Sequence, residues 1–379
     1  MRHIPDGGSA HTMEAKQATQ PTKSKRNYGV DLLRVFAILC VVLLHEGSHG
    51  GLIGATTGVH HNAVMLVMAC AYCAVDCFVI IGGFCQVDLR FKSKRILSLW
   101  ATALFYSVAV TIFMLFYNAT ALPELPFLRM FLPVLTNCWW FFTAYFGLML
   151  VSPLINLVFK HLDERKIKTL FALCLIAFCV APFIAGTDIF RFNSGYSFGW
   201  FVVLYVIGAC IRKINPFENW HKRWLIVYAI CVACCWIMAT YGNGAGIQPA
   251  LIPDHPWQWL SYLSPFILVS SIALLMFFSR LNIQGKALTS IIAFLTPSVF
   301  AVYLISDHEL IRNEFMKGGP AFAASLHTSE MILVMLGIAA GVFVICTLID
   351  KLRALVFKLF KVDNGILALG KRIDERLGI

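Results

Sequence analysis

Long apolar runs, separated by short polar loops, occupy most of the chain. An α-helix needs about 20 apolar residues to cross a bilayer. We therefore expect an all-α integral membrane protein with about ten transmembrane helices, near residues 29–48, 64–87, 96–117, 137–159, 168–186, 196–211, 224–241, 258–279, 288–307 and 329–349. An even number of spans places both termini on one side of the membrane.

The composition agrees with this pattern. Of the 379 residues, 59% are hydrophobic and only 13% are charged, and the mean hydropathy is +0.75. Soluble domains carry about 25% charged residues and disordered chains hold fewer apolar ones, so both classes are excluded. The net charge of +11 does not indicate nucleic-acid binding, because the basic residues lie in short clusters between apolar runs.

Those basic clusters predict the topology, because short loops rich in Lys and Arg stay in the cytoplasm. They occur in the N-terminal tail, in alternate loops and after the last span, whereas the intervening loops hold few cations. The clusters are Lys23, Lys25 and Arg26; Arg90, Lys92, Lys94 and Arg95; Arg165, Lys166 and Lys168; Arg212, Lys213, Lys222 and Arg223; and Lys351, Arg353, Lys358 and Lys361. We expect both termini to be cytoplasmic.

Three segments are predicted along the chain. Residues 1–27 form a polar, disordered cytoplasmic tail, part of which is absent if translation starts at Met13. Residues 28–350 form the membrane domain. Residues 351–379, which begin with KLRALVFKLFK, form an amphipathic cytoplasmic segment along the inner leaflet.

Charged side chains inside the spans need an explanation, because a charge in the bilayer is costly. Arg34 and His45 share the first span, where steps of about 100° bring both to one helix face, about 16 Å apart along the axis. A cation near the inner end suits a phosphate, and an imidazole further out can move a proton near neutral pH. Alternatively, Arg34 only snorkels to the surface or pairs with Asp31, and His45 is an interfacial histidine.

Asp76, in the second span, lies at a depth comparable with that of His45, counting about 1.5 Å per residue. A catalytic imidazole commonly has a carboxylate that fixes its tautomer, so Asp76 is a candidate orienting group. A structural hydrogen bond to backbone or Ser is the alternative. Asp307, His308 and Glu309 form a further charged cluster at the end of an apolar run.

No metal site is expected. His49, His60 and His61 lie in the first outer loop, where solvated side chains are the simpler interpretation. The 13 cysteines lie almost entirely inside the apolar runs and act as small hydrophobes. Trp139 and Trp140 are interpreted as anchors at the membrane interface, with stacking on sugar rings as the alternative.

Four stretches resemble the membrane acyltransferase family three. GVDLLRVFAILCVVLLH resembles its first helix, with an Arg and a His spaced by ten residues, and VDCFVIIGGF, WWFFTAYFGLMLVSPLIN and PSVFAVYLISDHELIR resemble later helices in the same order. The resemblance covers residues 28–350. It implies an O-acyltransferase of the bacterial cytoplasmic membrane that moves an acyl group, commonly acetyl, from acyl-coenzyme A to a hydroxyl of a surface or lipid-linked polysaccharide, with no permanently bound cofactor.

Two positions depart from that family's pattern. Ser98 stands where the family often has a second basic residue, three positions after the Arg matched by Arg95. Ser306 stands where the family usually has His, and His308 follows two positions later. His308 replaces that imidazole only if the helix ends there, because two residues turn a side chain by about 200°.

The mechanism is a hypothesis at this point. Arg34, Lys94 and Arg95 bind the phosphates of acyl-coenzyme A, and His45 acts as general base on the acceptor hydroxyl or as acyl carrier. The expected partners are the bilayer, acyl-coenzyme A and a glycan. The rival is a multi-pass transporter of a sugar, an amino acid or an acylated product, but no inverted repeats are visible and the charges gather on the first two spans.

Overall fold

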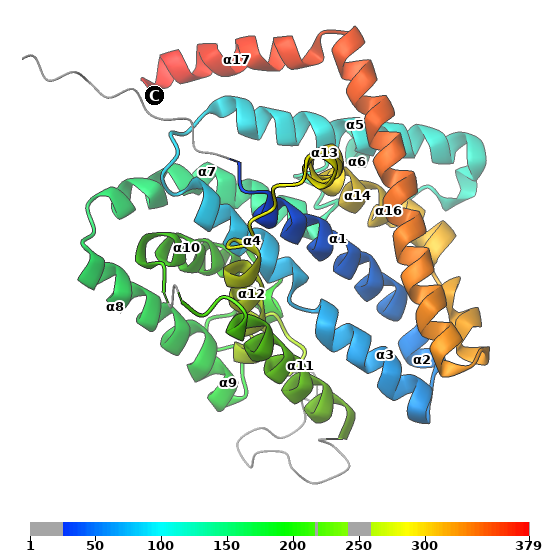
Figure 1. Ribbon diagram of the computed structural model, residues 1–379. Helices are drawn as coiled ribbons and strands as arrows, with labels where there is room; N and C mark the ends of the chain where they lie inside the picture. Colours follow the sequence, from blue (N-terminus) through cyan, green and yellow to red (C-terminus); the bar gives the residue numbers. More distant parts are fainter. Residues whose placement is uncertain (1–25, 217–218, 242–258, 379) are drawn as a thin grey trace, which may run out of the picture.

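The computed structural model describes residues 26–216, 219–241 and 259–378, and within these ranges the secondary structure is helical, without strands. The polar tail expected over residues 1–27 and the alternative start at Met13 lie almost wholly outside the described residues. Figure 1 shows the helices packed into one body, with the C-terminal helix across one end.

Eight helical segments are long and apolar enough to cross a membrane. They are α1 (Tyr28–Ser48), α3 and α4 (Gly58–Ala71 and Ala74–Gln86), α5 (Ser93–Tyr117), α7 (Trp140–Lys160), α8 and α9 (Glu164–Leu175 and Ala181–Ala185, joined by a π turn), α11 (Arg223–Tyr241), α13 and α14 (Lys286–Leu295 and Val299–Ser306, joined by a 3₁₀ turn) and α16 (Thr328–Leu359).

The two other predicted spans coincide with shorter helices. These are α10 (Phe198–Ile214), with 17 residues, and α12 (Pro265–Phe278), with 14 residues. Proline fixes the start of α12 because it suits the first helical turn and has no N–H to place. The all-α membrane fold is therefore as expected, whereas the number of ten spans and the side of the termini stay predictions.

The first two spans form the interior of the bundle. α1 and the α3–α4 segment are the most deeply buried of the apolar segments, and α4 packs closely on α10. A Cβ added at Gly83 would lie 2.0 Å from the carbonyl oxygen of Tyr205, and one at Gly208 would lie 2.1 Å from that of Ile80. Gly83 therefore serves helix packing, since no side chain fits between the two backbones.

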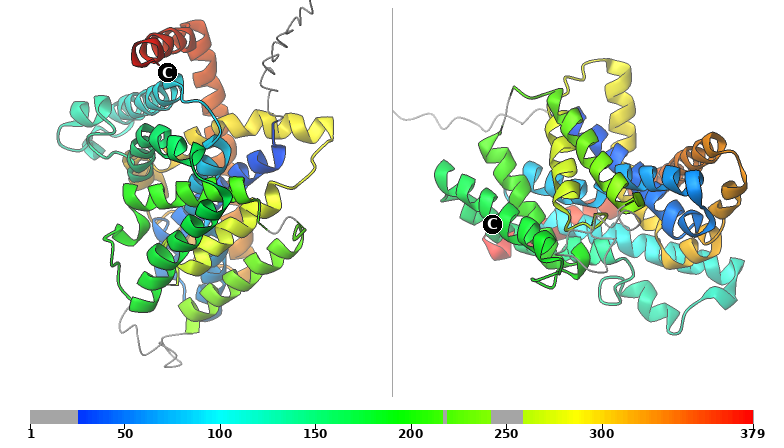
Figure 2. Two further views of the ribbon diagram at one scale, coloured as in Figure 1. Left: turned by 90° about the vertical axis from the view of Figure 1, so that its left-hand side faces the viewer. Right: turned by 90° about the horizontal axis from the view of Figure 1, so that it is seen from below.

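The C-terminal segment has a different division from the one expected. α16 continues through residue 351 to Leu359, because the Lys, Arg and Leu residues there are strong helix formers. The chain then turns at Lys361, which has a positive φ of 52°, into α17 (Val362–Leu377). α17 packs on the start of α5, where the Asp374 carboxylate accepts a hydrogen bond of 2.9 Å from the Ser93 N–H. Both Figure 1 and the left view of Figure 2 show α17 across this end.

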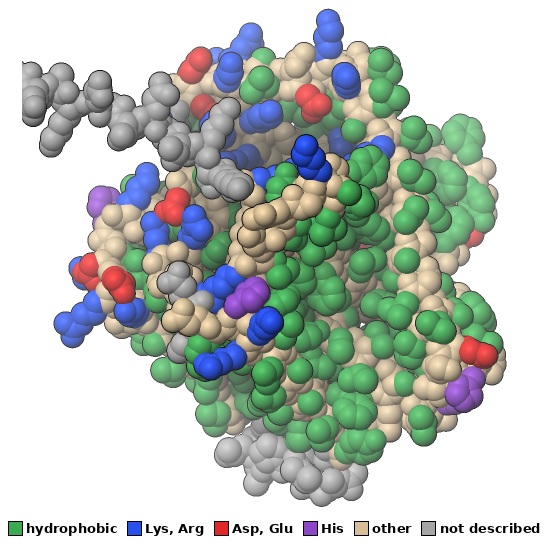
Figure 3. All heavy atoms as spheres, viewed as in Figure 1, with side chains coloured by type: hydrophobic (Ala, Val, Ile, Leu, Met, Phe, Trp, Pro, Cys, Tyr) green, Lys and Arg blue, Asp and Glu red, His purple; other side chains and the backbone are tan. Residues whose placement is uncertain are grey.

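The surface separates polar from apolar regions. In Figure 3, Lys and Arg side chains gather over the upper and left parts of the face shown, including near α17 and the turn between α7 and α8, while its right and lower parts are largely hydrophobic. An apolar surface of this kind suits contact with lipid tails. A basic edge suits the cytoplasmic side, which remains the predicted orientation.

Candidate active site

A cavity of about 610 Å³ runs along α1 into the interior of the bundle. Its walls come mainly from α1, α3, α4, α7 and α14, with Leu99 of α5, the 3₁₀ turn before α14 and the loops around residues 196 and 262. Most of the lining is aliphatic or aromatic, and few polar groups point into it, as in most small-molecule sites. Arg34 and His45 both line this cavity.

α1 presents one continuous face to the cavity. Its lining side chains recur at intervals of three and four residues, at Arg34, Ile38, Val41, Leu44, His45, Ser48 and His49. This is the periodicity of a single helix face. The expected register of Arg34 and His45 is therefore present, although the chemical roles of the two residues stay predictions.

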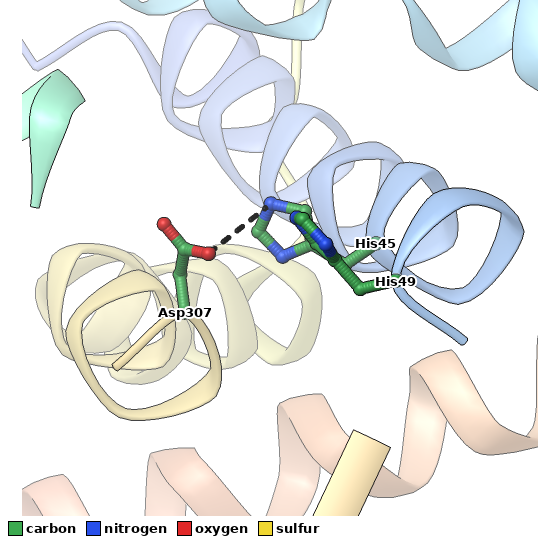
Figure 4. A group of neighbouring side chains, drawn as sticks. All are labelled: His45, His49 and Asp307. Atoms are coloured by element: carbon green, nitrogen blue, oxygen red, sulfur yellow. Dashed lines mark ion pairs between the residues drawn. The ribbon is translucent and has the colours of Figure 1, made fainter. Parts of the chain in front are cut away.

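A short segment after α14 brings a carboxylate to His45. α14 ends at Ser306, Asp307 has φ −97° and ψ 3°, and His308 is extended before the single turn α15 (Glu309–Ile311). Asp307 is buried, and its Oδ1 lies 3.7 Å from Nε2 of His45, as Figure 4 shows. Arg312 donates to the same oxygen at 2.9 Å. Protonation of His45 at Nε2 would thus place the imidazolium beside a carboxylate.

The second ring nitrogen of His45 has no partner among the residues that the structure describes. Nδ1 is buried and makes no hydrogen bond within the described part of the chain. Buried polar atoms are nearly always paired, and the exceptions need an explanation such as catalysis. His45 is 14% exposed at its side chain, so the ring can still meet a ligand in the cavity.

His49 lies one helical turn beyond His45. The two ring centroids are 5.5 Å apart, and the ligand atoms of His45, His49 and Asp307 all lie within 4.8 Å of one another. Figure 4 shows the two imidazoles side by side and facing Asp307. Partial burial, with His45 and Arg312 nearby, lowers the pKa of His49, so its neutral form is favoured. This donor set could accept a metal ion, which the sequence did not predict.

Arg34, at the other end of the α1 face, is partnered locally. It donates to Asp31 at 2.5 Å, and Asp31 also pairs with Arg26. Asp31 lies in the first turn of α1, which the Asn27 side chain caps by accepting from the Val30 N–H. The ion pair with Asp31 expected as an alternative is present, and Arg34 nevertheless lines the cavity.

Asp76 does not pair with His45, whose ion-pair partner is Asp307. The Asp76 carboxylate is completely buried and accepts a hydrogen bond of 3.3 Å from the Trp200 indole N–H. Equal depth in the bundle does not place two side chains together, because Asp76 lies on the face of α4 that packs on α10. Asp76 thus makes a structural hydrogen bond, as the alternative interpretation expected, but its partner is Trp200 rather than the backbone or a Ser.

Lys94 and Arg95 lie outside the cavity. Both are exposed at the start of α5. The α17 backbone lies close to Lys94, since a Cβ at Gly370 would come within 2.9 Å of the Lys94 nitrogen. Arg95 lines a small separate hollow that shares Gln86 with the main cavity. Any contact of these cations with a ligand is therefore made outside the cavity.

His308 points away from His45. α14 does end before His308, as the predicted role of this residue required. However, the His308 Nδ1 accepts from the Leu310 N–H at 3.3 Å, and the His308 Nε2 lies 3.8 Å from the Cys138 sulfur. Its ring and that of Trp139 are nearly perpendicular, with 5.1 Å between the ring centroids. Burial and the nearby Arg312 lower the pKa of His308 to about 4. His308 therefore does not replace the missing imidazole of the cavity, and Asp307 occupies that wall instead.

The sequence contained a signal for Asp307 but none for Arg312. Asp307 ends an apolar run, so it was visible as a charge that needed a partner. Arg312 follows in a polar stretch, and only the turn after α14 shows that it donates to Asp307.

The arrangement combines an imidazole, a carboxylate and a distant guanidinium along one cavity. A hydroxyl beside His45 could lose its proton to the ring, and an anionic group could bind at the Arg34 end. A family model described as an acyltransferase domain matches residues 27–351. No match was found among curated proteins or among solved structures. Because the model covers most of the chain, the protein belongs to this acyltransferase family, the membrane acyltransferase family three.

Proposed function

We propose that this protein is a membrane O-acyltransferase that moves an acyl group, typically acetyl, from acyl-coenzyme A to a hydroxyl of a cell-surface or lipid-linked polysaccharide. The observation that carries the proposal is the single cavity that holds Arg34 at one end and the His45–Asp307 pair at the other. Family membership supports the reaction class. The bacterial cytoplasmic membrane is the proposed location.

The donor enters from the Arg34 end. Arg34 carries a guanidinium suited to phosphate, and Arg95 and Lys94 provide further cations outside the cavity. The cavity is mostly apolar, which suits the pantetheine arm rather than the charged nucleotide. In this pose the nucleotide phosphates stay near the cations, and the thioester reaches toward His45, about 16 Å along α1.

The transfer takes place beside His45. Nδ1 of His45, which has no partner among the described residues, accepts the proton of the acceptor hydroxyl while the oxygen attacks the thioester carbonyl. The carbon–sulfur bond breaks, the coenzyme A thiolate takes the proton from the imidazolium, and an ester forms. Asp307, 3.7 Å from Nε2, stabilises the imidazolium, and Arg312 holds Asp307 in place. An acyl-His45 intermediate would use the same groups in two steps.

Chemical analysis of ester-linked acyl groups on surface glycans tests the proposal. Cells would carry the intact gene, a deletion, His45→Ala or His60→Ala, all at matched membrane abundance. His60 is a matched control because it hydrogen-bonds the Leu326 carbonyl and does not line the cavity. We expect the ester to disappear with the deletion and His45→Ala and to persist with His60→Ala.

The opposite result distinguishes the alternative. Ester that persists in His45→Ala but disappears on deletion would remove His45 from catalysis and favour a transporter of an acylated product. Unchanged ester in the deletion strain would contradict a surface polysaccharide as acceptor.

A further inference from the structure

One wall of the cavity is built from aromatic side chains with polar tips. Trp140, Tyr196, Tyr262 and Tyr72 all line the cavity. The Trp140 and Tyr196 rings are 4.6 Å apart between centroids, Tyr196 and Tyr262 are 5.0 Å apart, and Tyr72 and Tyr262 are 4.9 Å apart. We call these four side chains the aromatic wall.

The aromatic wall is assembled from distant parts of the chain. Trp140 begins α7, Tyr72 lies in the break between α3 and α4, and Tyr196 and Tyr262 come from the loops before α10 and α12. Trp140, proposed as an interface anchor, faces this cavity, whereas its neighbour Trp139 is buried and donates to the Leu304 carbonyl at 3.1 Å. The two adjacent Trp residues thus have different environments.

A strained loop holds Tyr196 on this wall. Three non-glycine residues just before it have positive φ, namely Arg191 at 56°, Asn193 at 53° and Ser194 at 55°. The Asp188 carboxylate stabilises the loop by accepting from the Phe192 N–H at 2.8 Å and the Ser194 N–H at 3.1 Å. Left-handed residues other than glycine are costly and are found mainly where surrounding structure enforces them, often at functional sites.

The loop also approaches Tyr262 too closely for a side chain. Gly195 has a φ of 96°, and a Cβ there would lie 2.4 Å from the Tyr262 Cβ. Only glycine satisfies both the backbone angle and this contact. The chain therefore fixes Tyr196 and Tyr262 against one another, while 41% of Tyr196 stays exposed and reachable by a ligand.

We infer that the aromatic wall is the acceptor subsite and binds a sugar ring by stacking, with the tyrosine hydroxyls hydrogen-bonding to ring hydroxyls. Aromatic side chains with a polar tip combine an apolar face with a hydrogen-bonding group, as a pyranose does. Burial raises the pKa of Tyr262, so its hydroxyl remains a donor. This inference rests on the proposed function and names the class of its acceptor.

The distribution of charged residues favours a sugar, rather than acyl-coenzyme A, as the ligand of the aromatic wall. The wall contains no Lys, Arg, Asp or Glu, and the cation suited to phosphate, Arg34, is at the other end of the cavity. The Tyr72 and Tyr262 hydroxyls each share a hydrogen bond with Tyr196, so a sugar hydroxyl can join an existing polar network, whereas an acyl chain offers it no hydrogen-bonding group. A sugar ring satisfies both the ring faces and the hydroxyls.

Acceptor kinetics test the inference in full-length protein in lipid nanodiscs. The donor is radiolabelled acetyl-coenzyme A, and the acceptor is surface polysaccharide from which esters have been removed with mild base. A second assay measures slow thioester hydrolysis without acceptor. The variants are Tyr196→Leu, Tyr196→Phe and Asp188→Ala, with Tyr117→Leu as control. Tyr117 is an exposed aromatic residue, stacked on Phe113 at 5.4 Å and outside the cavity.

We expect Tyr196→Leu to raise the acceptor KM about fivefold to tenfold, the size of one aromatic contact. Tyr196→Phe should retain much of the affinity because the ring remains. Asp188 is a positioning residue, so Asp188→Ala should raise the acceptor KM in the same way while kcat and donor hydrolysis stay within about twofold. Tyr117→Leu should change none of these values.

Three outcomes would overturn the acceptor subsite. An unchanged acceptor KM in both Tyr196→Leu and Asp188→Ala would remove the wall from acceptor binding. A parallel loss of donor hydrolysis would assign the wall to the donor. Parent protein that hydrolyses the thioester but does not acylate the polysaccharide would contradict a sugar ring as ligand. Failure of both hydrolysis and transfer in the parent would instead contradict the proposed function itself.

Discussion

The two ends of the cavity differ in how their charges are partnered. At the Arg34 end, two cations, Arg26 and Arg34, share the single anion Asp31; Arg34 and Asp31 lie in the first two turns of α1, and Arg26 lies just before the helix. At the His45 end, Asp307 and Arg312 neutralise one another, and both come from the segment after α14. The first end has an excess of positive charge that suits an anion. The second is balanced and suits a neutral hydroxyl and a thioester.

This difference indicates a division of labour. Binding of the donor depends on charge at the Arg34 end, whereas proton transfer depends on geometry at the His45 end. Substitutions at the two ends should therefore change different kinetic constants. These constants are measured on purified protein in nanodiscs with acetyl-coenzyme A and base-treated polysaccharide.

Among the substitutions of residues other than His45, Asp307→Asn should reduce kcat the most. The amide keeps the shape of the carboxylate but loses the charge that stabilises the imidazolium, so we expect kcat to fall about 10²-fold with the donor KM unchanged. The exposed Asp163 at the start of α8 is a matched control, and Asp163→Asn should have no effect on kcat. A kcat for Asp307→Asn within twofold of the parent would contradict a role for Asp307 beside His45.

Arg34→Gln should act on donor binding instead. We expect the acyl-coenzyme A KM to rise roughly tenfold, because a charge-assisted hydrogen bond is worth about 1.5–3 kcal/mol. Acetyl-pantetheine, which lacks the nucleotide and its phosphates, provides the control substrate. Its KM should be the same for parent and Arg34→Gln, and an equal rise with both substrates would show that Arg34 does not bind phosphate.

Zinc should inhibit by binding His45, His49 and Asp307. His49→Ala removes one of the three donors, so we expect it to weaken inhibition severalfold while leaving most of the basal activity. Metal ligands must be deprotonated, and the lowered pKa of His49 keeps this ring neutral at pH 7. A chelator should restore activity. Loss of activity on chelation, or equal zinc sensitivity in His49→Ala, would contradict this prediction.

His308→Gln should have the smallest effect on rate, because His308 faces Cys138 and Trp139. Its effect should be on stability. The pKa of His308 is about 4 in the folded protein, below the usual 6.5. As the pH falls, this side chain is therefore protonated in the unfolded chain before it is protonated in the folded protein. The stabilisation is therefore complete above pH 6.5 and is lost as the pH falls toward 4.

Melting temperatures of parent and His308→Gln between pH 7 and pH 4 check this sign. The parent should lose up to about 3 kcal/mol of stability through this group, and His308→Gln should lose less over the same interval. Identical acid sensitivity of the two proteins would show that His308 is not held in its neutral form.

The sequence predicted the features that depend on helix geometry. Apolar run length gives the membrane helices, and the 3.6-residue period gives the common face of Arg34 and His45. The Arg34–Asp31 pair was also visible, because residues three apart on a helix are neighbours. These are local properties of one helix.

The sequence did not predict the features that depend on where chain breaks occur. Asp307 reaches His45 because α14 ends at Ser306, and His308 turns outward for the same reason. Depth along two helices made Asp76 a reasonable partner for His45, but depth does not give rotation about each axis. Tyr196 joins the aromatic wall only through a loop with positive φ angles, which hydrophobic periodicity does not reveal.

The most direct test of the central claim is acetyl transfer by His45→Ala together with equilibrium binding of acetyl-coenzyme A to the same preparation. If His45 is the base at the reacting end of the cavity, transfer should fall about 10²- to 10⁴-fold while donor affinity stays within twofold of the parent. His60→Ala should match the parent in both. Transfer by His45→Ala at the parent rate, with normal donor binding, would contradict the account.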